Sequence, residues 1–301
     1  MRRGTALLDF SLLAGGLIGL SSLAPARAYL AEFGIEGMHV VSTAANDVQA
    51  SVSPDGRRIV WASDRAGGSG AWDLWQATLD GNRWRDPQPL AINSDRDERT
   101  PAFSADGRWL YFASDRAGGR GGGDLYRAPV RAGGFGPAEP LGAEINSAGD
   151  ERAPVPDRSG QHLLFASDGH RGKGGFDLFV ADADGATFGP PRPLPGINSR
   201  ADETGGAWLG DGAALVFSRE TGGPRAASQL QLAQCTGERY AGAAPLKLSF
   251  NTADARTLGA GLDWSKPGEL LVSGIARSPR AGQLDIYRMK APTVTGTPGC
   301  V

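Results

Sequence analysis

The sequence predicts an all-β fold in which one supersecondary unit repeats along most of the chain. Turn glycines recur at steps of 51, 53, 52 and 56 residues, at Gly56, Gly107, Gly160, Gly212 and Gly268. A second landmark, the aliphatic residue of an aspartate–aliphatic–aromatic motif or its counterpart, keeps the same steps at Leu74, Leu125, Leu178, Leu230 and Ile286. Two landmarks in register over five units indicate a repeat architecture.

Each unit contains the pattern of four strands. The first strand is short and rich in small residues, as in 100–103, and ends in a turn such as SPDG at 53–56, where glycine supplies the positive φ. The second strand is apolar on both faces, which indicates burial, at 59–61, 110–112, 163–165 and 214–217. The third carries the aspartate–aliphatic–aromatic motif, and the fourth is rich in proline, which fits an edge strand, at 135–141 and 188–194.

Four antiparallel strands per unit, with the proline-bearing strand outermost, are typical of a propeller blade. The last unit stops after its third strand at 285–289, and the segment from Phe33 to Val41 resembles a fourth strand. We therefore expect a single β-propeller of five four-stranded blades in which the N-terminal strand completes the last blade. A sixth blade would need about 50 further residues, which the chain does not have. A closed ring protects its own sheet edges, so we expect a monomer.

The N-terminus resembles a secretory signal peptide over residues 1–28. Arg2 and Arg3 precede an apolar run from Phe10 to Leu23, and Ala26-Arg27-Ala28 supplies a cleavage site. We expect a periplasmic or secreted protein cleaved near Ala28, with the propeller domain and a short C-terminal tail in residues 29–301. No later stretch reaches about 18 consecutive apolar residues, so we expect no membrane span. The formal net charge of −2 gives no indication of nucleic-acid binding.

The chain has two cysteines, Cys235 and Cys300. In an oxidising compartment an even number of cysteines favours pairing, so we expect a disulfide between them. Two free thiols, one at a strand end and one on the tail, are the alternative.

The SPDG turn, the apolar strand, Ala62-Ser63-Asp64-Arg65, the glycine-rich loop and Asp73-Leu74-Trp75 together resemble the WD40-like repeat of the TolB type, the periplasmic propeller of the Tol-Pal envelope system. The resemblance covers roughly residues 33–291 and is clearest in the first three repeats. It implies an exported, non-enzymatic scaffold that binds a protein or peptide partner in the cell envelope.

Strand order places two loop types on one face of the ring, the connections between blades and those from second to third strand. The first type carries Asn-Ser-x-x-Asp-Glu, which provides Asp97, Glu98, Asp150, Glu151, Asp202 and Glu203. The second type carries Ser-Asp-Arg, which provides Arg65 and Arg116. In the third unit the arginine of this motif is missing, and His170, Arg171 and Lys173 follow Ser167-Asp168. We expect carboxylates around the channel mouth and arginines farther out.

These repeated residues have two interpretations. Each carboxylate either caps loop N–H groups or pairs with a loop arginine, or the acidic mouth binds a cationic group, a metal ion or a basic peptide. Residues repeated in every blade serve the fold more often than a ligand, so we favour the structural interpretation. His170, Arg171 and Lys173 form a basic patch without a counterpart in the first unit and are the better binding candidates, with a solvated loop as the alternative.

The sequence contains few enzyme motifs. His39, His162 and His170 fall at different places in the repeat and lack metal-ligand spacing, and there is no G-x-S-x-G or phosphate loop. We predict no catalytic residue, no metal and no cofactor, a divalent cation in the acidic ring being unsupported. The alternative function is a carbohydrate-active enzyme or lectin that uses Asp97, Asp150 or Asp202, although aromatic residues for sugar stacking are not evident at the mouth.

Overall fold

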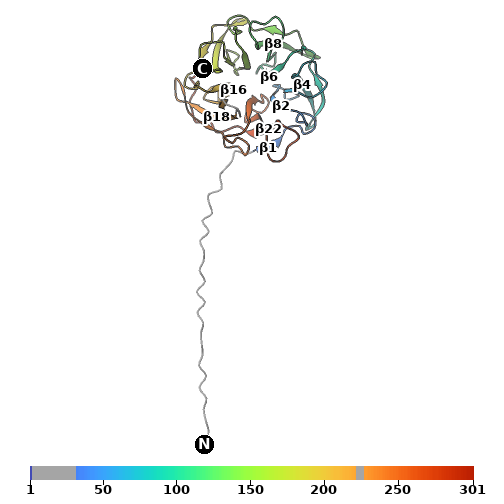
Figure 1. Ribbon diagram of the computed structural model, residues 1–301, viewed down its shortest axis with the longest axis vertical. Coiled ribbons are helices and arrows are strands. Elements are labelled where there is room, and N and C mark those ends of the chain that lie inside the picture. Colours follow the sequence, from blue (N-terminus) through green and yellow to red (C-terminus); the bar gives the residue numbers. More distant parts are fainter. Residues whose placement is uncertain (2–31, 222–226) are drawn as a thin grey trace.

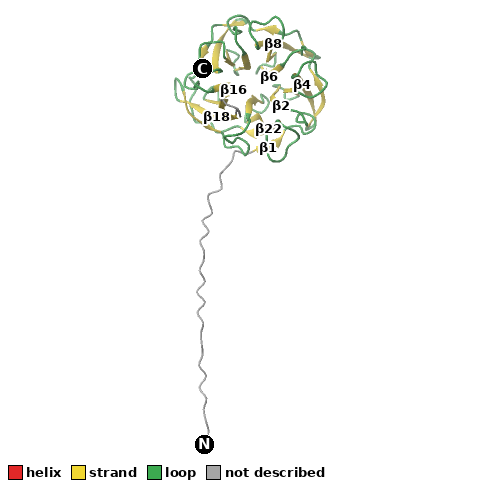
Figure 2. Cartoon of the chain, in the orientation of Figure 1, coloured by secondary structure: helices red, strands yellow, loops and turns green. Residues whose placement is uncertain are grey.

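The computed structural model describes residue 1, residues 32–221 and residues 227–301. These residues form a five-bladed β-propeller, in which five sheets surround a central channel (Figure 1). The described ranges contain strands and loops and no helix (Figure 2). The predicted fold class is therefore confirmed. Apart from Met1, the predicted signal peptide lies outside the described residues.

The sheets follow one another along the chain, and each runs from an inner strand at the channel to an outer strand. Blade one comprises β2 (Asp47–Val52), β3 (Arg58–Ser63), β4 (Asp73–Asp80) and β5 (Arg83–Pro89). Blade two comprises β6 (Glu98–Phe103), β7 (Trp109–Ser114), β8 (Asp124–Arg131), β9 (Gly134–Phe135) and β10 (Glu139–Pro140). Blade three comprises β11 (Glu151–Pro156), β12 (His162–Ser167), β13 (Asp177–Asp184), β14 (Thr187–Phe188) and β15 (Arg192–Pro193).

Blade four comprises β16 (Asp202–Leu209), β17 (Ala214–Thr221), β18 (Ala227–Cys235) and β19 (Tyr240–Pro245). Blade five comprises β20 (Leu258–Leu262), β21 (Glu269–Gly274), β22 (Asp285–Lys290) and the N-terminal strand β1 (Glu32–Ile35). In Figure 1, β2, β6 and β16 lie near the centre of the ring, and β4, β8 and β18 lie farther out.

The outer strands of blades two and three differ from the expected continuous strand. Each is divided into two short pieces, β9 with β10 and β14 with β15, that pair with the same third strand. Pro137 lies between the first two pieces, and Pro190 and Pro191 lie between the second two. A proline has no N–H for the ladder, so the hydrogen-bonded pairing stops there.

The ring is closed by the N-terminal strand, as expected, although the pairing segment is shorter than the predicted 33–41. β1 pairs antiparallel with β22, and the Glu36 N–H donates to the Ile286 carbonyl. After Glu36 the chain leaves the sheet, because Gly37 and His39 adopt φ values of 52° and 68° and turn it toward blade one.

The C-terminal tail returns from blade five to blade four. Thr297 forms a bridge with Thr236, and the Gln234 side chain accepts the Thr295 N–H. Cys235 and Cys300 form a disulfide across a sequence separation of 65 residues. The tail is thus tied to the end of β18.

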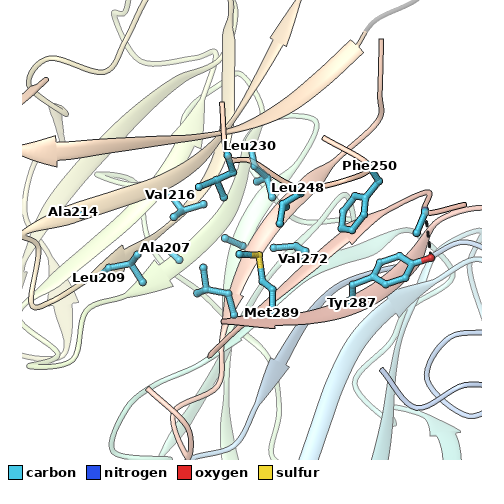
Figure 3. Close-up of a cluster of buried hydrophobic side chains, with 14 residues drawn as sticks. Ala207, Leu209, Ala214, Val216, Leu230, Leu248, Phe250, Val272, Tyr287 and Met289 are labelled. Carbon is cyan, nitrogen blue, oxygen red and sulfur yellow. Dashed lines mark hydrogen bonds between the residues drawn. The ribbon is translucent and has the colours of Figure 1, made fainter. Parts of the chain in front are cut away.

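The core consists of apolar layers between neighbouring blades. Figure 3 shows the layer between blades four and five, where Val216 and Leu230 of one blade face Val272 and Met289 of the next. The second strands are buried on both faces, as predicted, and burying one aliphatic side chain of this size contributes about 1.5–3 kcal/mol.

The turns after the inner strands adopt the predicted conformation in the first four units. The φ angles of Gly56, Gly107, Gly160 and Gly212 are 71°, 70°, 74° and 86°. Gly268 has no positive φ, because the last unit uses a longer turn in which Lys266 N–H donates to the Asp263 carbonyl and Glu269 N–H to the Lys266 carbonyl.

Candidate functional site

A depression of about 670 Å³ lies where the inner strands begin. We call it the mouth, and the face that carries it the mouth face. All five blades contribute lining residues, among them Gln49, Thr100, Glu151, Thr204 and Leu258. The channel beneath it holds only about 40 Å³, because its wall is made of small residues whose backbones approach closely. At Gly261, for example, a Cβ atom would lie 1.8 Å from the Ala50 carbonyl oxygen. The mouth therefore has room for a small-molecule ligand, and the channel does not.

The glutamates of the Asn-Ser-x-x-Asp-Glu loops are buried parts of the fold. Glu98 is 0% exposed, and its carboxylate accepts hydrogen bonds from the Ser94 N–H at 2.9 Å and the Ser114 hydroxyl at 2.8 Å. Arg116 donates to the same carboxylate at 3.0 Å and to the Ile92 carbonyl at 3.0 Å. The guanidinium thus joins the loop that enters blade two to the loop after its second strand. We call this arrangement the blade clamp.

The blade clamp recurs with substitutions. In blade one Arg65 donates to Asp47 at 2.5 Å and to the Val41 carbonyl at 2.6 Å. In blade four Arg219 donates to Glu203 at 2.7 Å. Glu203 is 0% exposed, like Asp47. In these positions the carboxylates and arginines hold loops together.

In blade three the clamp has no arginine. The Nε2 of His170 lies 2.8 Å from the Ile145 carbonyl, the contact that Arg116 makes to Ile92 in blade two. Its ring packs against Phe165 and Phe179, with centroid distances of 5.8 and 5.4 Å. Glu151, 1% exposed, accepts hydrogen bonds from Ser147 and Ser167. His170 therefore has counterparts in blades one and two, contrary to its predicted place in an unmatched basic patch.

The aspartates of the same loops hold the neighbouring blade with one oxygen. Asp97 Oδ1 accepts the Trp72 N–H at 3.1 Å, and Asp150 Oδ1 accepts the Gly123 N–H at 2.9 Å. Asp202 Oδ1 accepts the Phe176 N–H at 3.1 Å. Asp97 and Asp150 also line the mouth, whereas Asp202 is not among its lining residues.

Arg171 and Lys173 lie on the loop from β12 to β13 and are exposed. Neither lines the mouth. The Lys173 ammonium donates to the Asn198 carbonyl at 3.3 Å, so one of its N–H groups already has a partner on the mouth face.

The asymmetry of the mouth arises from one ring position. In blades one, two, three and five, the penultimate residue of the second strand pairs with Val48, Arg99, Arg152 and Leu258, respectively. In blade four the corresponding residue is Thr204, which follows Glu203 as Arg99 follows Glu98 and lies at the bulge between Glu203 and Gly205. All five residues line the mouth. Blades two and three thus supply adjacent arginines, and blades five and one supply an aliphatic pair. A ligand in this mouth meets Arg99 and Arg152 on one side, and Val48 and Leu258 together with polar residues of blades five and one on the other.

Each arginine is held by an aromatic ring and an aspartate. The Arg99 guanidinium lies 4.2 Å from the Trp72 ring centroid and 2.9 Å from Asp97. The Arg152 guanidinium lies 3.5 Å from the Phe176 centroid and 3.8 Å from Asp150. Burial lowers the pKa of Arg152, and the charges of Glu220, Asp150 and Asp168 oppose that effect.

Glu220 is the carboxylate of blade four at a position where blades one to three have an aspartate, and its hydrogen bonding differs from theirs. By strand register it follows Arg219 at the place of Asp115 in blade two. Asp115 accepts the Asp97 N–H, whereas Glu220 accepts the Thr204 hydroxyl at 2.8 Å and lines the mouth.

The floor of the mouth contains strained backbone. Gln49, Thr100 and Ala153 have φ values of 56°, 53° and 53°, each at a bulge of an inner strand. A β-branched residue such as Thr100 rarely adopts this conformation. Its hydroxyl accepts the Ala153 N–H of the next blade at 3.1 Å. Bulges and strain of this kind cluster at functional sites.

Sequence analysis missed most of this site. Trp72 lines the mouth, contrary to our interpretation that aromatics are not evident there, and Phe176 lies against the mouth residue Arg152. Both aromatic residues immediately precede the aspartate of the repeated motif. Arg99 and Arg152 each follow a motif glutamate. Comparing the five units for residues that differ at equivalent positions would have found Arg99, Arg152 and Glu220. Among residues 32–221 and 227–301, no group of three histidine, cysteine or acidic side chains is arranged to hold a metal ion.

No protein-family model and no curated protein sequence matches the chain. Solved structures do match. An endo-arabinase from Bacteroides thetaiotaomicron is similar with a TM-score of 0.53 and 15% identity over 87% of this chain and 98% of that chain. The catalytic domain of an α-L-arabinofuranosidase of family GH62 from Coprinopsis cinerea is similar with a TM-score of 0.53 and 11% identity, over 87% and 97%.

A putative TolB from Agrobacterium tumefaciens has a TM-score of 0.49 and 14% identity, over 87% of this chain and 86% of that chain. The chain also spans 32–37% of the length of several matching peptidases. At these identities the matches establish the propeller fold. The TolB-type relationship remains a prediction.

The comparisons contradict our expectation that the protein is not an enzyme. That expectation followed from a resemblance to a binding propeller, but the solved structures that share the fold over nearly their whole length include glycoside hydrolases. The described residues also include no helix long and apolar enough to cross a membrane.

Proposed function

We propose that the protein binds a carbohydrate in the mouth and hydrolyses a glycosidic bond there. The observation that carries this proposal is the composition of the mouth: Asp97, Asp150, Glu220, three arginines and the Trp72 ring border one cavity of about 670 Å³, and the ring of Phe176 lies against one of these arginines, Arg152. Small-molecule sites of about 300–1,000 Å³ with a few convergent polar groups are typical of ligand pockets. The fold shared with an endo-arabinase and an arabinofuranosidase supports the same class.

The carboxylates fit two different roles. Glycoside hydrolysis needs one carboxyl group as acid and a second as base or nucleophile. Asp150 lines the mouth and lies 3.8 Å from the Arg152 guanidinium, and we assign it the base or nucleophile. Glu220 is held by a hydroxyl, and we assign it the acid.

The arginines and rings would bind and orient the sugar. Guanidinium N–H groups donate to sugar hydroxyl oxygens, and the half-buried rings of Trp72 and Phe176 offer apolar surface beside them. Val48 and Leu258 on the other side of the mouth provide a surface for the less polar face of a sugar ring.

The test combines a glycan array with a hydrolysis screen over plant and bacterial polysaccharides. We expect at least one glycan to be bound and cleaved. Glu220→Gln should lower kcat by about 100-fold or more while binding persists, in the range of losing one acid catalyst. Asp184→Asn, an exposed carboxylate outside the mouth, is the matched control. Failure to bind or cleave any glycan would refute the proposal.

A second candidate is a protein or peptide partner on the mouth face, as the TolB-type resemblance implies. Arg171 and Lys173 are exposed there and break the repeat. Replacing both by glutamate should reduce the partner captured from an envelope extract, with Arg192→Glu as the control. Equal capture by both variants would remove this patch from consideration.

Export is part of both proposals. The N-terminal segment has the features of a signal peptide, and a disulfide such as Cys235–Cys300 persists in oxidising compartments. Fractionation of cells that express the full chain tests this, since a cytoplasmic, reduced product would contradict it.

A further inference from the structure

A second cavity, of about 360 Å³, opens between blades two and three on the face opposite the mouth. We call it the rear cleft. Its wall includes Tyr111 and Arg127 of blade two and Phe188 of blade three. Arg108 and Arg158, on the turns that follow the inner strands, lie at its rim.

Tyr111 and Arg127 lie at a place where blades three and four have aliphatic pairs and where blades one and five have one polar residue each, Gln76 and Arg288. The two residues face each other across β7 and β8. Their counterparts are Leu164 with Val180 in blade three and Val216 with Leu232 in blade four. A phenol and a guanidinium therefore stand where two neighbouring blades place aliphatic pairs.

Arg127 is fixed in one orientation. Its guanidinium lies 4.2 Å from the Trp109 ring centroid, and its charge opposes the effect of burial on the pKa of Tyr111. Burial raises the pKa of Tyr111, so this hydroxyl stays protonated at neutral pH and can donate into the cleft. Pre-organised donors of this kind bind with a smaller loss of side-chain entropy.

Arg127 has fewer carboxylate partners than Arg288, its counterpart in blade five, so more of its N–H donors are available to a ligand. Arg288 pairs with Glu36, Asp263 and Glu269 at 2.6, 2.6 and 2.7 Å, so its role is structural. Arg127 has one carboxylate neighbour, the half-exposed Glu139, at 3.6 Å.

The charge around the cleft favours an anion. Three arginines line it, Arg108, Arg127 and Arg158, against one acidic residue, Asp106. Arg108 pairs with Asp106 at 2.6 Å and Arg158 with Asp211 at 3.4 Å, but both arginine side chains are more than half exposed and free to turn toward a ligand. Planar guanidinium groups bind carboxylate and phosphate in a bidentate manner.

We propose that the rear cleft is a binding site for a monosaccharide-sized ligand that presents a carboxylate or phosphate group to Arg127 and the Tyr111 hydroxyl. The indole of Trp109 and the ring of Phe188 then border the remainder of the ligand. The site is separate from the mouth, so it is independent of the carbohydrate-hydrolysing activity proposed above.

Titration calorimetry on the full chain tests this site with three probes: glucuronate, glucose 1-phosphate and neutral glucose. We expect one binding site of millimolar affinity or tighter for at least one of the two anions and a much weaker response to glucose. Binding of glucuronate alone identifies carboxylate chemistry, and binding of glucose 1-phosphate alone identifies phosphate chemistry.

The variants locate the site. Arg127→Gln should weaken anion binding by about tenfold or more, because a charge-assisted hydrogen bond is lost. Tyr111→Phe keeps the ring and removes only the hydroxyl, so it should weaken binding severalfold even if Arg127→Gln folds poorly. Arg192→Gln, an ion-paired arginine on β15, and Arg152→Gln in the mouth should bind as the natural protein does.

Two results would overturn the proposal. One is the absence of binding for both anions. The other is binding that Tyr111→Phe and Arg127→Gln leave unchanged, or that Arg152→Gln abolishes, since the anion would then occupy another surface.

Discussion

His170 and Arg116 make the same contact in neighbouring blades. The His170 Nε2 lies 2.8 Å from the carbonyl oxygen of Ile145, and an Arg116 N–H donates at 3.0 Å to that of Ile92. The histidine does not reach the buried glutamate of its blade, whereas the arginine does. Blade three therefore replaces an ion pair by packing against two phenylalanine rings.

This replacement predicts how His170→Ala behaves. The variant loses one hydrogen bond and two ring contacts, so we expect the free energy of unfolding to fall by about 1–3 kcal/mol. Urea denaturation measures it. Arg171→Ala, at the exposed neighbouring position, should change stability by less than about 0.5 kcal/mol. Equal losses in the two variants would contradict the packing role of His170.

The blade clamp predicts a larger effect in blade two. Glu98→Ala leaves Arg116, whose side chain is 18% exposed, without its carboxylate, and breaking such a buried pair costs about 3–5 kcal/mol. The exposed pair Arg108–Asp106 provides the contrast, because Asp106→Ala removes a bond worth about 1 kcal/mol or less. A double-mutant cycle on Glu98 and Arg116 isolates their coupling, and a coupling near zero would show that the clamp does not stabilise the fold.

The disulfide predicts a redox-dependent stability. Crosslinking Cys235 to Cys300 closes a loop with a sequence separation of 65 residues, and loop entropy gives about 4 kcal/mol for a loop of this length. We expect the Cys235→Ser and Cys300→Ser double variant to unfold at a lower urea concentration than the oxidised protein. The reduced natural protein should match the variant, and a reduced protein as stable as the oxidised one would contradict this.

The polar turns predict acid sensitivity. Burial disfavours the charged form of Asp157, but hydrogen bonds from the Ser159 hydroxyl and from His162 outweigh it and hold the pKa of Asp157 below 3.8. The pKa of Asp106 is lowered in the same way by Ser104 and Arg108. A depressed pKa in the folded state stabilises the protein above pH 3.8 and loses that contribution as the pH falls through the folded-state pKa.

We therefore expect Asp106→Asn with Asp157→Asn to lower stability at pH 6 and to flatten the loss of stability below pH 4. Denaturation curves at both pH values measure this. Asp184→Asn serves as the control and should shift neither. A double variant with the natural slope below pH 4 would contradict the assignment.

The repeat was predictable because its periodicity depends on residues that every blade needs. Gly56 and Gly107 supply the same turn, and Leu74 and Leu125 the same buried position, so two landmarks locate the blades. In the turns themselves, Ser53 donates to Asp55, whereas in blade three Ser159 donates to Asp157 with the two residue types exchanged. The turn requires a hydrogen bond between a serine and an aspartate two residues apart, and either order of the two residues provides it.

The site was less predictable, because its residues are not the ones that every blade needs. Glu98 is buried because Ser114 and Arg116, at the end of β7 and in the loop after it, bond its carboxylate. The Asn-Ser-x-x-Asp-Glu motif alone does not show whether a repeated carboxylate faces this loop or the channel. Arg99 and Arg152 lie at one ring position, but their neighbours at that position are Val48, Thr204 and Leu258. Residues that differ between repeats do not contribute to the repeated pattern, so they are found only when the aligned units are compared position by position for differences.

The pairing of β1 with β22 constrains the order in which the ring can form. These strands lie at opposite ends of the chain, and Arg288 of β22 bonds Glu36, a separation of 252 residues. During synthesis the segment that becomes β1 emerges first and has no partner until almost the last residue of blade five has left the ribosome. A product truncated before β22 therefore leaves β1 without its partner and the last blade incomplete. Completion of the ring thus distinguishes full-length chains from fragments, whose unpaired edges leave them open to proteases and to aggregation.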